Sequence, residues 1–102
     1  MPTVDFIYDS SCPNVTATRV NLIRAFARAG VPARWSEYEI GDANSPVRTH
    51  GFGSPTILVN GRDIAGASPE TASSCRLYDG EGVPRVALIV TALTRALSDC
   101  GP

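Results

Sequence analysis

The first forty residues constrain the fold of this chain most, because they place one helix between two strands. Residues 3–8 are rich in β-favouring side chains and predict a short strand. After Pro13, which suits the first helical position, apolar residues recur at helical spacing. Gly30 marks the end of this predicted helix. Residues 33–40 predict a second strand. This β-α-β unit is expected to hold its two strands parallel.

The second half of the chain predicts a hairpin and a further helix. Residues 56–59 are apolar throughout, which is typical of a central strand buried on both faces. Asn60-Gly61 is a strong signal for a tight hairpin, so residues 62–65 should form an antiparallel neighbour. After weaker signals, Pro84 opens a second helix with one apolar face. The expected class is α/β, with a four-stranded mixed sheet and flanking helices.

The composition fits one domain spanning residues 1–102. With 102 residues and 43% apolar side chains, the chain can build one sizeable core. Its nine basic residues are all arginines, spread along the chain beside ten acidic residues, which argues against a nucleic-acid footprint. No apolar stretch reaches the length of a membrane span, and the start lacks the pattern of a signal peptide. We expect a cytoplasmic monomer with neither nucleic acid nor membrane as partner.

Cys12 is the strongest candidate for a reactive residue. It lies between the first predicted strand and the first predicted helix, immediately before Pro13. At this position the free amides and the positive end of the helix dipole favour thiolate over thiol, and the thiolate is the nucleophilic form. The alternative is that Cys12 is a small apolar residue at the start of the helix, with no chemical role. The polar neighbours Ser10 and Ser11 favour an accessible, reactive thiol.

A proline directly before the central strand is the second candidate feature. Pro55 removes a backbone donor from the sheet, which is well explained by a tight turn with a cis bond between Ser54 and Pro55. That turn would leave the backbone of Ser54 free to pair with an extended peptide or a thiol substrate. An ordinary trans proline that starts the strand is the alternative.

Together these features resemble the thioredoxin-like superfamily, and within it the small glutaredoxin-like proteins and a group of small bacterial thioredoxin-family proteins. The segments that carry the resemblance are Cys12-Pro13-Asn14-Val15, Gly53-Ser54-Pro55-Thr56, the Asn60-Gly61 hairpin, Ile64-Ala65-Gly66 and Ser-Cys-Arg-x-Tyr at 74–78. The resemblance implies a thioredoxin-like fold of glutaredoxin type and thiol:disulfide oxidoreductase activity on protein or low-molecular-weight disulfides. It makes Cys12 the catalytic thiol, with no bound cofactor but with glutathione as a candidate co-substrate. It assigns substrate binding to Pro13, Ser54, Pro55, Thr56 and Gly66.

The sequence departs from the two-cysteine motif of this superfamily at Val15, where a second thiol would stand. A resolving thiol must therefore come from an external molecule or from elsewhere in the chain. Cys75 is the internal candidate, because the segment after the fourth strand borders the same cleft in the resembled fold. The alternative is a Cys75 that fills the core beside Leu77. Cys100, near the C-terminus, is expected to be a bystander.

Two other functions are compatible with the same residues. Cys12, with or without Cys75, would suit a module that binds a soft metal or an iron-sulfur cluster, because thiolates favour such metals. The chain would otherwise be a catalytically silent interaction domain of the same fold. The cysteine spacing predicts no zinc site, and His50 cannot form one alone. Arg48 and Arg76 flank the expected cleft and are candidates for binding a carboxylate such as that of glutathione.

Overall fold

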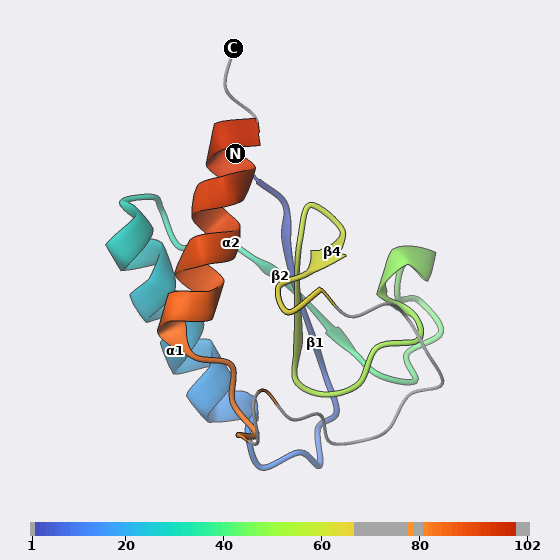
Figure 1. Ribbon diagram of the computed structural model, residues 1–102. Coiled ribbons are helices and arrows are strands. Elements are labelled where there is room, and N and C mark those ends of the chain that lie inside the picture. The colour runs from blue at the N-terminus through green and yellow to red at the C-terminus, as the bar shows by residue number, and fades with distance from the viewer. Residues whose placement is uncertain (1, 67–77, 79–80, 100–102) are drawn as a thin grey trace.

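The computed structural model describes residues 2–66, 78 and 81–99 of the chain. Within these residues it is an α/β structure whose elements are arranged as Figure 1 shows. In chain order they are β1 (Val4–Tyr8), α1 (Val15–Ala29), β2 (Ser36–Glu39), the short 3-10 helix η1 (Val47–Thr49), β3 (Thr56–Val59), β4 (Arg62–Asp63) and α2 (Val86–Asp99).

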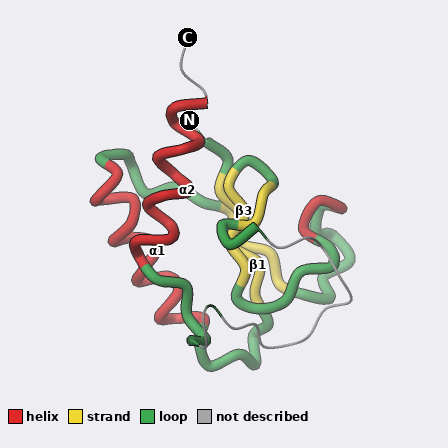
Figure 2. Tube along the Cα trace, in the orientation of Figure 1, coloured by secondary structure: helices red, strands yellow, loops and turns green. Residues whose placement is uncertain are grey.

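The four strands form one mixed sheet in the order β2-β1-β3-β4, seen with the helices beside it in Figure 2. β1 runs parallel to β2 and antiparallel to β3, and β3 runs antiparallel to β4. The expected parallel strands and the expected hairpin are therefore both confirmed. Asn60 and Gly61 have φ angles of 51° and 79°, the left-handed pair that the tight two-residue hairpin turn requires.

The two faces of the sheet are covered by different parts of the chain. Figure 1 shows α1 and α2 on one face and the loop that contains η1 on the other. Because side chains alternate along a strand, Phe6 of β1 and its register partner Ile57 of β3 both belong to the main core under the helices. Ile7 and Leu58 form a smaller apolar cluster with Phe52. The main core therefore lies between the sheet and the two helices.

The first helix begins two residues later than Pro13 suggested. α1 starts at Val15 with Asn14 as its N-cap residue, so Cys12 lies two residues before the cap, in a turn closed by a hydrogen bond from the Cys12 N–H to the Asp9 carbonyl (2.8 Å). The end of the helix agrees with the sequence: Gly30 takes the left-handed conformation with a φ of 75°, which glycine adopts without strain.

The second helix, β2 and β4 are each shorter than expected by two or more residues. α2 starts at Val86 rather than at Pro84, and β2 covers only residues 36–39. β4 ends at Asp63 because the Asp63 Oδ2 accepts a hydrogen bond from the Ala65 N–H (2.9 Å), which turns the chain away from β3.

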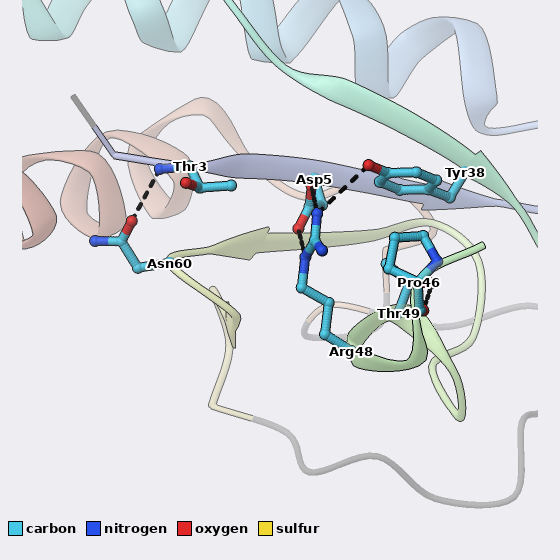
Figure 3. A network of polar contacts seen from close by, with 7 residues as sticks. All are labelled: Thr3, Asp5, Tyr38, Pro46, Arg48, Thr49 and Asn60. Atoms are coloured by element: carbon cyan, nitrogen blue, oxygen red, sulfur yellow. Dashed lines mark hydrogen bonds and ion pairs between the residues drawn. The ribbon is translucent and has the colours of Figure 1, made fainter. Parts of the chain in front are cut away.

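A fully buried carboxylate lies in the middle of β1. Asp5 is 0% exposed, and Arg48 of η1 donates to it twice, from Nε to Oδ2 (3.0 Å) and from Nη2 to Oδ1 (3.2 Å) (Figure 3). Nη2 also donates to the Tyr38 hydroxyl at 3.4 Å, and the guanidinium carbon lies 5.7 Å from the centre of that ring. The hydrogen bonds to Asp5 raise the pKa of Arg48. This ion pair fastens the η1 loop to the sheet.

We expect Arg48→Met to destabilise the fold, because the Asp5 carboxylate would stay buried without its counter-ion. Urea unfolding measures the loss of free energy. The matched control is Arg24→Met, which removes an exposed arginine of α1 that makes no ion pair with the described residues. Adding Asp5→Asn to Arg48→Met should recover part of the loss. Equal stability of the two single variants would contradict this role of the pair.

A second ion pair joins α1 to β2. Arg19 donates to Glu37 twice, from Nε to Oε2 (2.9 Å) and from Nη2 to Oε1 (2.8 Å), and the Trp35 Nε1–H also donates to Oε2 (2.9 Å). The guanidinium lies over the rings of Phe6 and Tyr8, which adds a cation–π attraction. The hydrogen bonds from Arg19 lower the pKa of Glu37 below its ordinary value.

The lowered pKa of Glu37 predicts a pH-dependent contribution to stability. A carboxyl group whose pKa is lower in the folded chain stabilises the fold above its unfolded pKa, and the contribution disappears as pH falls through the folded value. Glu37→Gln should therefore lower the free energy of unfolding at pH 6, and the difference should shrink below about pH 4. The control is Glu39→Gln in the same strand. A difference that is unchanged at pH 3 would contradict the assignment.

Candidate thiol site

The structure brings the Cys12 loop and the Ser54–Pro55 segment together at one end of the sheet. The main chain of Asp9, just after β1, binds both of them. Its carbonyl accepts the Cys12 N–H (2.8 Å), and its N–H donates to the Ser54 Oγ (2.9 Å). Two segments that are more than forty residues apart in the sequence thus share one anchor residue.

The turn before Cys12 is organised by the Asp9 carboxylate. Its Oδ1 accepts hydrogen bonds from the Ser11 N–H (3.0 Å) and the Ser11 hydroxyl (2.8 Å). These two bonds lower the pKa of Asp9, because they favour the ionised form. Ser10 and Ser11 take the exposed positions of this turn.

Cys12 itself is buried, which corrects the expectation of an accessible thiol. The residue is only 6% exposed and belongs to the main core, together with Val15 and Phe6. The physical reason is the turn: its serines face solvent while the cysteine, a small and weakly polar side chain, joins the apolar interior. Pro13, the next residue, is exposed.

The peptide bond between Ser54 and Pro55 is cis, as the sequence predicted. Ser54 and Thr56 are each 0% exposed, and Pro55 is fully buried as well. The Thr56 hydroxyl donates to the Gly53 carbonyl (2.7 Å), which closes the turn that leads into β3. The segment expected to bind substrate is therefore covered, not open to solvent.

Tyr78 covers part of this segment, and sequence reasoning gave it no role at the site. It is 6% exposed, and its hydroxyl donates to the Pro55 carbonyl. Its main chain forms an antiparallel bridge with Glu81, in which each residue donates its N–H to the carbonyl of the other. The available signal was an aromatic residue directly before Asp79-Gly80-Glu81-Gly82, a composition typical of a turn.

The other candidate residues divide between those placed elsewhere and those outside the described part of the chain. Gly66 is exposed, on the turn after β4, with a φ of 78°. Arg48 is held by Asp5 and does not flank the thiol, which lies in the core under the helices. The ring of exposed His50 contacts the Ser45 carbonyl (3.0 Å). Cys75, Arg76 and Cys100 lie outside the described residues.

Neither a metal centre nor a membrane span is found in the part of the chain that the structure describes. No group of three or more His, Cys, Asp or Glu side chains lies close enough there to hold a metal ion. The helices of the same part are too short or too polar to cross a bilayer.

Comparison with family models gives no match to this chain, and no curated protein or solved structure matches it either. What the site does must therefore be argued from its own residues.

The hydrogen bond between Asp9 and Ser54 should contribute to stability. Ser54→Ala removes the acceptor and leaves the Asp9 N–H unpaired in a partly buried place, so we expect a loss of about 1–3 kcal/mol in the free energy of unfolding. Ser10→Ala, an exposed change in the same turn, should alter it by less than about 0.5 kcal/mol. Similar values for both variants in urea unfolding would show that Ser54 does not anchor the two loops.

Proposed function

We propose that the chain is a thioredoxin-like domain of glutaredoxin type that exchanges thiols and disulfides at Cys12. The order of its elements, a β-α-β unit followed by a hairpin and a helix, supports this fold. The observation that carries the proposal is the shared anchor at Asp9, which holds the Cys12 loop and the Ser54–Pro55 turn side by side. A thiol beside a buried cis-proline turn is the arrangement that the resembled superfamily uses to bind and attack a disulfide.

The proposed reaction begins with attack of the Cys12 thiolate on one sulfur of a substrate disulfide. A mixed disulfide forms, and the other substrate sulfur leaves as a thiolate. With an internal resolver, Cys75 then attacks the Cys12 sulfur and displaces the second substrate thiolate, leaving a disulfide between Cys12 and Cys75. With an external resolver such as glutathione, its thiolate attacks the substrate sulfur, and Cys12 leaves as thiolate. The internal route reduces both substrate sulfurs to thiols and oxidises Cys12 and Cys75. The external route reduces one substrate sulfur and leaves the other in a disulfide with glutathione, which a second glutathione then reduces.

The substrates of this proposal are protein or low-molecular-weight disulfides, and the protein acts as a monomer in the cytoplasm. A reducing compartment would keep Cys12 as a free thiol ready for attack. Because Cys12 is only 6% exposed, attack requires the surrounding loops to open first. The exchange rate is then limited by how often Cys12 becomes accessible.

The burial of Cys12 also favours a second candidate, a catalytically silent interaction domain of the same fold. In that case the thiol is one more apolar side chain of the core. The two candidates differ in one measurable property, the reaction of Cys12 with a disulfide while the chain is folded.

The test compares the unchanged protein with Cys12→Ser, Cys75→Ser and Cys100→Ser in glutathione-coupled reduction of hydroxyethyl disulfide. Mixed disulfides are trapped with acid and located by peptide mass. We expect Cys12→Ser to fall to the rate of uncatalysed exchange and the control Cys100→Ser to keep full activity. If Cys75 resolves, Cys75→Ser should accumulate the mixed disulfide at Cys12, and if an external thiol resolves, it should behave like the unchanged protein.

Two outcomes would contradict the proposed enzymatic function. One is activity that survives Cys12→Ser. The other is an unchanged protein that shows no turnover and whose Cys12 resists iodoacetamide until the chain is unfolded by urea. The second outcome is the one that the silent domain predicts.

A further inference from the structure

A groove between α2 and the β3–β4 hairpin is lined by two arginines that form no ion pair within the described residues. It has a volume of about 490 Å³, within the range of about 300–1,000 Å³ typical of small-molecule sites. Arg62 of β4 and Arg95 of α2 both line it, and both are exposed. Neither makes an ion pair with any residue in the described part of the chain.

The backbone explains why both guanidiniums border the same groove. Arg62 pairs with Val59 in the hairpin register, so its side chain shares the face of the sheet that lies under the helices. On α2, Leu88, Ala92 and Arg95 recur at helical spacing and lie along one side of the helix, toward the hairpin.

The floor of the groove is apolar. Val59 is 5% exposed, and Ile64, Leu88 and Ala92 are partly buried. Asp63 also lines the groove, but its carboxylate is directed away from the two guanidiniums. It pairs with Leu58 in register, which directs its side chain to the opposite face of the sheet, and its Oδ2 accepts the Ala65 N–H.

We propose that this groove binds a small amphipathic anion, with its apolar body on the floor and its carboxylate between Arg62 and Arg95. Two guanidiniums that form no ion pair in the described structure, beside a partly buried apolar surface, favour a ligand that has both a negatively charged head and a hydrocarbon tail. Guanidinium groups form paired, charge-assisted hydrogen bonds with carboxylates, which gives the head its orientation.

This site is separate from the proposed thiol site. Val59 pairs with Val4 at the start of β1, whereas Cys12 follows the end of β1, so the groove and the thiol lie at opposite ends of that strand. Anion binding therefore does not depend on thiol exchange, and one proposal can fail without the other.

The test is a titration of the full chain with octanoate, followed by amide chemical shifts in nitrogen–proton NMR spectra. We expect saturable shifts confined to residues 59–64 and 88–96. Arg62→Gln and Arg95→Gln should each weaken binding about tenfold, because each removes one charge-assisted contact. Octanamide, which has the same tail without the charge, should bind about tenfold more weakly than octanoate.

Two controls keep the result interpretable. Arg24→Gln changes the net charge by the same amount on the exposed side of α1 and should leave the affinity unchanged. Cys12→Ser should also leave it unchanged. The proposal is overturned if octanoate gives no saturable shifts, if the shifts lie outside the groove, or if Arg24→Gln weakens binding as much as Arg62→Gln.

Discussion

The antiparallel pairing of β1 with β3 determines where the other parts of this molecule meet. With Phe6 opposite Ile57, the end of β1 lies beside the start of β3. Cys12 follows β1 and Ser54 precedes β3, so both lie at the same end of the sheet. The same register brings the hairpin turn to the start of β1, where the Asn60 Oδ1 accepts the Thr3 N–H (2.8 Å). A slip of one residue would turn every side chain of β3 to the wrong face.

Features that depend on neighbouring residues could be predicted from the sequence. Gly30 ends α1, Asn60-Gly61 makes the hairpin turn, and Pro55 follows a cis bond, all as expected. In each case the determining preference belongs to a few consecutive residues. The strands and helices were correct in type and order, but several were too long by two or more residues. β4, for example, ends early where Asp63 accepts a hydrogen bond from the Ala65 N–H.

Contacts between distant residues could not be predicted in the same way. Nothing near Asp5 in the sequence indicates that Arg48, 43 residues later, would neutralise it. Tyr78 reaches Pro55 across 23 residues. The burial of Cys12 was missed for a related reason: polar neighbours identify a loop, but the direction of each side chain depends on how the turn is closed, and here the closing group is the Asp9 carbonyl. The Cys12 loop and the Ser54–Pro55 turn do lie together, but the expected accessibility of Cys12 was wrong.

β2 has a consequence for how copies of this chain meet one another. It is the edge of the described sheet beyond β1, and its outer backbone groups would accept another strand. Glu37 and Glu39 occupy two of its four positions, and Glu39 is exposed with no ion pair in the described structure. A second copy of β2 laid along this edge would bring carboxylates close to carboxylates. The acidic edge thus works against the open-ended strand stacking that leads to aggregation.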